Sequence, residues 1–125
     1  MPILIQVPDK YQALADSFSQ ILKTVQAQQE ATPDGAPVDY GQLEQELAQG
    51  TAAIERAAHA LMLQSLDVDA PQVVIDGQAY RRVMRSPGDY YTMAGAVSVQ
   101  RTLYRKATQR TGATVDAISL RTGGA

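Results

Sequence analysis

Cysteine and tryptophan are both missing from this chain of 125 residues, which has one phenylalanine and one histidine. Without cysteine, the chain forms no disulfide and supplies no thiolate for catalysis or for zinc binding. The single histidine, His59, lies among alanines and leucines and has no second histidine with which to share a metal ion. We therefore expect His59 on a helix, either on its surface or in the core of the protein, and we predict no metal site and no cofactor.

Long hydrophobic runs are missing as well. No apolar segment approaches the ~20 residues that a transmembrane helix needs. Residues 1–7 lack the basic region of a signal peptide, and their apolar run is too short for one. We therefore expect a soluble, cytoplasmic protein that has no membrane partner.

The sequence also lacks a recognisable set of catalytic residues. The serines have no GxSxG context, and the glycines match neither a P-loop nor a dinucleotide-binding fingerprint. Acid pairs such as Asp67 and Asp69 lie in polar surroundings and are better explained as solvated charges than as an acid–base couple. We predict that this chain is not itself an enzyme.

Charge is distributed unevenly along the chain, although the net charge is only −2. Residues 1–70 contain ten acids and three bases, for a net charge of −7, whereas residues 71–125 contain three acids and eight bases, for +5. Asymmetry of this kind indicates a polyanion-binding face on the basic side. We place the boundary near Pro71, between an acidic helical segment (1–70) and a basic domain (71–125).

Two heptad stripes dominate the acidic segment. After a short extended stretch over 2–7, a helix is predicted over 9–30 with Asp9 as its N-cap, and a second over 39–66 with Asp39 as its cap. Apolar residues recur alternately three and four positions apart in the first helix, and mainly seven apart in the second. They are Tyr11, Leu14, Phe18, Ile21 and Val25 in the first helix, and Leu43, Leu47, Ile54 and Leu61 in the second.

These stripes predict an antiparallel helical hairpin. Gly50 and Ala57 lie on the second stripe, where small side chains allow another helix to approach closely. Glycine in a helix interior costs about 1 kcal/mol relative to alanine, so a break at Gly50 is an alternative. The stripes pack either within one chain or between two, which leaves open a homodimer through the helical half.

Turn signals divide residues 73–105 into short strands. The signals are Asp76-Gly77, Ser86-Pro87-Gly88 and Ala94-Gly95. Between them, the ranges 73–75, 80–85, 90–93 and 97–104 are rich in aromatic and β-branched residues, and 115–120 can add a further strand. The predicted fold class is therefore α+β, with two long amphipathic helices followed by a small antiparallel β-meander.

Arginines and tyrosines on this sheet are the candidate binding residues. With strict alternation, Arg81 and Arg85 share one side of a strand and Arg82 lies on the other. Arginine can bind phosphate through two hydrogen bonds, and tyrosine can stack or donate to a backbone. The alternative is a sheet face whose arginines pair with acids of the helical half. The candidates are Arg81, Arg82, Arg85, Arg101, Arg105, Lys106, Arg110, Arg121, Tyr80, Tyr91 and Tyr104.

The basic half also resembles a known family. It resembles the N-terminal region of ISKra4-type insertion-sequence transposases, in which a G-x-x-Y-R-R-V-x-R-S strand and a Y-x-T-x-x-G-x-V-x-V-x-R-x-x-Y-R hairpin are followed by an L-x-x-R-x-G element. The matching residues are Gly77, Tyr80, Arg81, Arg82, Val83, Arg85, Ser86, Tyr90, Thr92, Gly95, Val97, Val99, Arg101, Tyr104, Arg105, Leu120, Arg121 and Gly123.

The resemblance implies a bacterial protein in a DNA transposition context. The family's catalytic carboxylates belong to a downstream RNase H-like domain, which is not in this sequence, so none of them is assigned to a residue here. Many relatives also carry cysteines near positions 106–115, and this chain has none. The expectation is a non-catalytic end-recognition or assembly module, either part of a transposase or a separate small protein.

Two functions follow from the sequence. In the first, arginines on the antiparallel sheet bind the phosphates of duplex DNA, and the helices pack or dimerise. In the second, the helical half is a protein-interaction or dimerisation module, the sheet is a scaffold, and no nucleic acid is bound.

Overall fold

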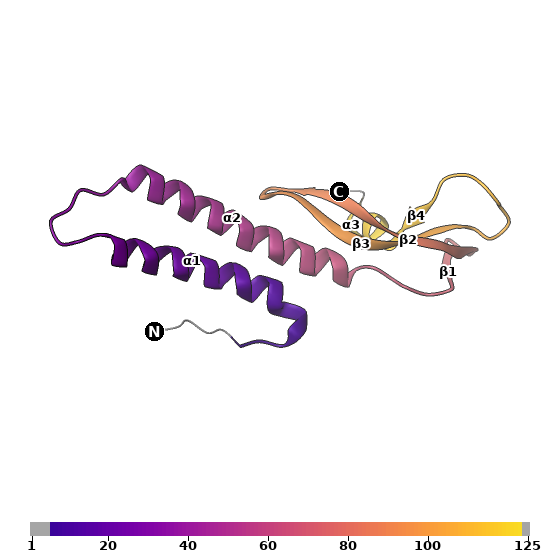
Figure 1. Cartoon of the computed structure of the whole chain (residues 1–125). Helices are drawn as coiled ribbons and strands as arrows, with labels where there is room; N and C mark the ends of the chain where they lie inside the picture. Colours follow the sequence, from indigo (N-terminus) through magenta and orange to yellow (C-terminus); the bar gives the residue numbers. More distant parts are fainter. Residues whose placement is uncertain (1–5, 124–125) are drawn as a thin grey trace. The chain divides into compact units, whose positions relative to one another are not determined.

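The computed structural model describes residues 6–123 and contains two long helices followed by an antiparallel sheet, which confirms the α+β prediction (Figure 1). The chain divides into two compact units, one ending at Ala58 and the other beginning at His59. Most of the stretch predicted as extended over 2–7 lies outside the described residues. The elements are a 3-10 turn η1 (Asp9–Tyr11), α1 (Gln12–Ala31), α2 (Tyr40–Ser65), β1 (Gln72–Ile75), β2 (Gln78–Thr92), β3 (Gly95–Lys106), β4 (Val115–Asp116) and α3 (Ala117–Thr122).

The first unit is built from α1 and the larger part of α2. The Asp39 carboxylate accepts a hydrogen bond from the Gln42 backbone N–H at 3.0 Å, so Asp39 is the N-cap that the sequence predicts for α2. Asp9 is not the predicted cap, because it lies within η1 and Tyr11 occupies the N-cap position of α1. Helix α2 continues unbroken through Gly50, where a β-carbon would lie 2.8 Å from the Ile21 side chain. Glycine at this position therefore allows α1 to approach α2 closely.

The predicted apolar stripes lie on the two helices of the hairpin, and the packing of these helices buries only a small part of them. In the described part of the first unit, Ala15 is the only buried residue. Phe18 remains 48% exposed and Tyr11 41% exposed, while Ile21 and the predicted stripe residues of α2 (Leu43, Leu47, Ile54 and Leu61) are half-buried. A groove of about 530 Å³ runs along this side of the hairpin, and the stripe is partly open to it. The groove is lined by Val7, Tyr11, Leu14, Ala15, Phe18, Ile21, Leu22 and Ile54.

The second unit is a four-stranded meander in the order β1-β2-β3-β4, with every neighbouring pair antiparallel. The β1–β2 connection is the predicted Asp76-Gly77 turn, in which the two residues have φ values of 50° and 76°. Two successive positive φ angles are what a type I′ hairpin turn requires. Strands β2 and β3 then pair from Tyr80 opposite Lys106 to Thr92 opposite Gly95, which makes one long hairpin.

The turn predicted at Ser86-Pro87-Gly88 does not form, and β2 runs straight through it. Pro87 lies opposite Gln100, whose N–H and C=O both point away from β2 toward the Gln64 side chain. Pro87 therefore occupies a non-hydrogen-bonded position on a stretch of β2 that has no strand on its other side, where a missing N–H costs nothing. Gly88 next to it is buried, and a β-carbon there would lie 2.7 Å from the Arg101 side chain.

The core of the second unit lies on one face of the β2–β3 hairpin. Tyr90, Val97, Val99 and Ile118 are buried together, and the half-buried side chains of Ala60, Leu63 and Leu66 pack against them. The last turns of α2 thus belong to the sheet unit, whereas the change in composition lies further along, near residue 70. The segment predicted as a strand over 115–120 instead forms the short β4 and then α3.

Candidate nucleic-acid interface

The central arginines of β2 do not alternate as predicted, because the strand contains a bulge. The register shifts between Arg82 and Met84, so that Arg82 lies opposite Tyr104 and Arg85 opposite Thr102. Thr102 and Tyr104 share one face of β3, and directly opposed residues lie on the same face of an antiparallel pair. The bulge therefore places Arg85 on the face of Arg82 instead of that of Arg81.

Both arginines on that face are paired with aspartates of the segment after α2. Arg82 lies 2.7 Å from Asp69, and Arg85 lies 3.6 Å from Asp67 and 3.9 Å from Asp69. Asp67 is itself fixed to the sheet, because its carboxylate accepts hydrogen bonds from the backbone N–H and the hydroxyl of Thr102, each at 2.9 Å. The positive charge of Arg82 and Arg85 is compensated within the fold.

Arg101 is compensated on the opposite face. Its guanidinium lies 3.8 Å from the Asp116 carboxylate, and its stem covers Gly88. The Arg101 Nε is buried and has no hydrogen-bond partner among the described residues. Three of the predicted phosphate contacts, Arg82, Arg85 and Arg101, therefore have acid partners inside the second unit.

Asp116 is the centre of a buried polar network. Its carboxylate accepts hydrogen bonds from the Tyr90 hydroxyl at 2.7 Å and from the Ser119 backbone N–H at 3.0 Å, and the latter bond caps α3. Burial disfavours the charged carboxylate and would raise its pKa, but these hydrogen bonds and the nearby Arg101 together lower the pKa of Asp116 below its ordinary value. Burial, as the largest cause, raises the pKa of the Tyr90 hydroxyl, which therefore stays neutral and donates to Asp116.

The depressed pKa of Asp116 predicts acid-sensitive folding. Stability from a carboxylate whose pKa is lower in the folded chain is present above the unfolded value, close to 3.8, and is lost as the pH falls through the folded value. We expect the urea midpoint of the chain to fall as the pH is lowered below about 4, through the folded pKa of Asp116. In Asp116→Asn, which has no carboxylate at this position, that fall should be smaller; an identical pH profile would contradict the assignment.

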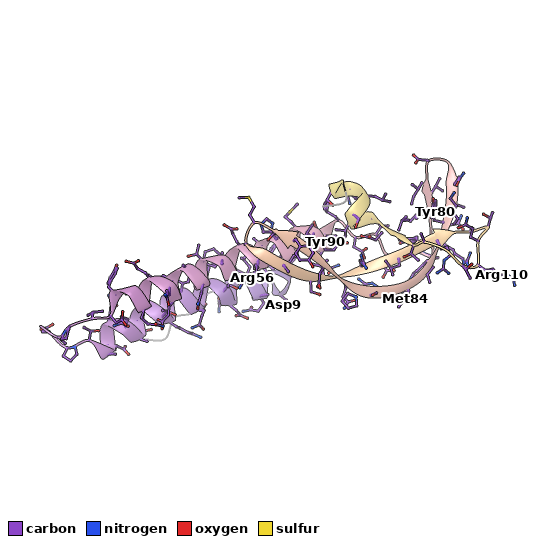
Figure 2. All side chains as sticks on the ribbon, turned by 90° about the horizontal axis from the view of Figure 1, so that it is seen from above. Asp9, Arg56, Tyr80, Met84, Tyr90 and Arg110 are labelled. Atoms are coloured by element: carbon purple, nitrogen blue, oxygen red, sulfur yellow. The ribbon has the colours of Figure 1, made fainter. Side chains whose placement is uncertain are left out.

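Four cations gather at the end of the sheet that is remote from the β2–β3 turn, and we call Arg81, Arg105, Lys106 and Arg110 the cationic end. Arg81 lies directly opposite Arg105, and Lys106 directly opposite Tyr80. Figure 2 shows Tyr80 and Arg110 at this end, whereas Tyr90 lies far along the hairpin. Within residues 6–123, no ion pair joins any of the four to an acid.

The two arginines of the cationic end are held by backbone carbonyls. The Arg81 guanidinium donates to the carbonyls of Lys106 and Ala107 at 3.3 and 3.2 Å. Arg105 donates to the carbonyls of Arg110 and Gly112 at 3.0 and 3.2 Å, which ties the loop after β3 back onto the strand. These bonds orient the guanidinium groups and leave their charge uncompensated.

The other predicted residues lie elsewhere. Tyr104 is buried, and its hydroxyl donates to the Val68 carbonyl and accepts from the Ala70 N–H. Tyr91 is 80% exposed but lies beside the β2–β3 turn, opposite Ala96. Arg121 lies on α3 and donates to the Leu66 carbonyl at 3.2 Å. Only Tyr80 among the predicted tyrosines accompanies the cationic end.

Sequence reasoning missed two side chains that occupy the open edge of β3. The Gln64 amide bonds to both the N–H and the C=O of Gln100, at 3.0 and 2.8 Å, and Asp67 takes the next outward-facing N–H, that of Thr102. Together they replace a neighbouring strand, which removes a template for edge-to-edge aggregation. Their only signal in the sequence was their position just before the change in composition near residue 70.

A metal-binding cluster and a membrane-spanning helix are both missing from the part of the chain that the structure describes. No group of three or more histidine, aspartate or glutamate side chains in residues 6–123 is placed to hold a metal ion. In the same range, no helix combines the length and the apolar character needed to cross a bilayer. Comparisons with family models, with curated proteins and with solved structures found nothing that matches the chain.

Proposed function

We propose that this chain is a non-catalytic DNA-binding module of a transposase-like protein and that its phosphate contacts are made by the cationic end. The proposal is supported by the absence of acid partners for Arg81, Arg105, Lys106 and Arg110 in the described chain. Phosphate oxygens are strong acceptors for such donors, and tyrosines such as Tyr80 frequently add a backbone contact.

The cross-strand arginine pair is the observation that carries the proposal. Like charges directly opposite each other in an antiparallel sheet destabilise the sheet. Arg81 and Arg105 occupy such a position, while Arg82 and Arg85 nearby have aspartate partners. A local arrangement that destabilises the fold, and that no acid of the same chain neutralises, is expected at functional sites. A polyanion between the two guanidinium groups supplies that compensation.

Binding to duplex DNA in a salt series tests the proposal. We expect the full chain to bind a random duplex at 50 mM salt, with log K falling against log[salt] at a slope of about −3.6 for four neutralised phosphates. In Lys106→Gln/Arg110→Gln, the slope should fall to about −1.8, because two contacts are lost. Fluorescence anisotropy of a labelled duplex measures both slopes.

The matched control removes the same charge from the compensated arginines. Arg82→Gln/Arg85→Gln also loses two positive charges, yet its slope should remain near that of the original chain, because these side chains face Asp67 and Asp69. Equal slopes in both double variants would contradict the cationic end as the contact surface. No binding by the unaltered chain at 50 mM salt would favour a protein-interaction module without nucleic acid.

A further inference from the structure

The open apolar stripe of the helical hairpin is a second surface, independent of the cationic end. Tyr11 at the end of η1 and Phe18, Leu22 and Val25 on α1 are 41, 48, 44 and 38% exposed, and no charged side chain lines the groove beside them. The Ile21 side chain points toward Gly50 of α2, so one edge of the stripe forms the contact between the two helices. The other edge has no such contact. Exposed apolar side chains at heptad spacing are typical of a helix–helix interface.

The charges of α1 are all placed away from this stripe. Asp16, Lys23 and Glu30 follow one another at seven-residue intervals, on the side of the helix opposite to Tyr11, Phe18 and Val25. The positions that flank the stripe within α1 are Ala15, Leu22 and Gln29 on one side and Ser17, Thr24 and Ala31 on the other. A partner that docks on the stripe therefore meets no charge from α1 along its edges.

From this arrangement we infer that the occupant of the stripe is the same hairpin of a second copy of this chain, so that two hairpins form a four-helix bundle. No charged residue lines the groove, and the Lys10 ammonium lies beside it, 4.9 Å from the centre of the Tyr11 ring, so the groove offers a partner mainly apolar contacts. A second copy offers an identical uncharged stripe, which a two-fold axis places against the first. The residues that close the interface are thus the same on both sides.

The size of the hairpin face suits a stable dimer. Helix α1 has 20 residues, and at 1.5 Å per residue it is about 30 Å long. Two helices side by side are about 20 Å wide, so the face covers ~600 Å², near the ~800 Å² that each partner contributes to a standard interface. Four helices around one apolar core then bury side chains that two helices leave open.

The effect of salt on binding distinguishes a second copy of this chain from a basic partner. Residues 1–58 contain eight acids and three bases, for a net charge of −5, so two copies repel each other at long range. Salt screens that repulsion, and a dimer of like-charged hairpins should hold equally well or tighten between 50 and 500 mM salt. Association with a basic partner would weaken over the same range, as DNA binding does.

Sedimentation equilibrium of the full chain tests the inference. We expect a species of twice the 13.5 kDa chain mass, with a dissociation constant that does not rise with salt. Phe18→Glu should weaken dimerisation by roughly 30-fold or more, the effect of losing a central aromatic contact, while far-UV circular dichroism stays helical. Because Phe18 is 48% exposed, the hairpin does not need it in order to fold.

The matched control is Gln20→Glu, which places the same charge on α1 outside the stripe, in a groove that Lys23 also lines. It should dimerise like the original chain. A monomer at 100 µM would overturn the inference. A dimer that Phe18→Glu leaves intact, or that Gln20→Glu disrupts equally, would also overturn it. DNA binding by a monomer would leave the proposed function standing.

Discussion

Replacing Tyr104 with alanine is expected to remove a large part of the stability of the sheet unit. Tyr104 is 2% exposed, and its hydroxyl joins β3 to the segment after α2 through Val68 and Ala70. Truncating a large buried aromatic side chain costs about 3–5 kcal/mol in lost burial and cavity formation. Domains of this size have a total unfolding free energy of about 5–15 kcal/mol, so the loss is a large part of it.

Urea unfolding followed by circular dichroism measures this loss, and two further variants locate its cause. Tyr104→Phe keeps the ring and should cost about 1–3 kcal/mol, because the Val68 carbonyl and the Ala70 N–H lose their partner. Tyr91→Ala, at a tyrosine that is 80% exposed on the same hairpin, should change stability by less than about 0.5 kcal/mol. Equal effects at the two tyrosines would contradict the burial of Tyr104.

Tyr104 also shows why composition alone does not assign binding residues. In the sequence it is one of several tyrosines next to arginines, which is typical of nucleic-acid contact. In the structure its face of β3 is covered by Asp67 and the residues that follow, and the contact between Tyr104 and Val68 spans 36 positions of the chain. No periodicity within the strand indicates which face such a segment covers.

The helices were predictable because their signals are local. Alternating spacings of three and four residues, a loop rich in proline and glycine, and Asp39 as a cap all act within a few residues of each other. Both helix ranges agree with the structure to within a few residues. The Asp76-Gly77 turn was predictable for the same reason, since its type I′ geometry depends only on residues that tolerate positive φ.

The sheet departed from prediction where a distant element decides the outcome. Pro87 and Gly88 are turn formers in isolation, but β3 pairs through them, and Gly88 gives space to Arg101 from the neighbouring strand. The bulge between Arg82 and Met84 shifts the alternation of side chains and moves Arg85 to the other face. Strict alternation was therefore valid up to the bulge, and the predicted grouping of Arg81 with Arg85 was wrong beyond it.

Long-range ion pairs explain why the arginines divide into two groups. The alternative interpretation of the sequence, in which arginines of the sheet pair with acids of the helical half, is confirmed for Arg82 and Arg85, which pair with Asp69 and Asp67. The arginines at the cationic end are equally basic in the sequence but have no acid opposite them in the described chain. A count of basic residues cannot separate these groups, because the difference lies in which strand faces which.

Asp116→Ala is expected to destabilise the sheet unit by about 3 kcal/mol, because one carboxylate has several structural roles. It caps α3 through the Ser119 N–H, a role worth about 1 kcal/mol, and it accepts the hydroxyl hydrogen bond of the buried Tyr90. Hydrogen bonds to charged groups are worth about 1.5–3 kcal/mol, and their loss leaves Tyr90 without an acceptor. Arg101, at 3.8 Å, loses its acid partner as well.

Hydrogen exchange of the β3 amides and urea unfolding would both report the change. Asp89→Ala removes the same charge from an exposed position of β2 and should stay within about 0.5 kcal/mol of the original chain. Asp116→Asn keeps an oxygen acceptor for Ser119 and Tyr90, so we expect it to fall between the two, near 1 kcal/mol. If Asp116→Asn were as damaging as Asp116→Ala, the charge opposite Arg101 would dominate, and the hydrogen-bond network would be secondary.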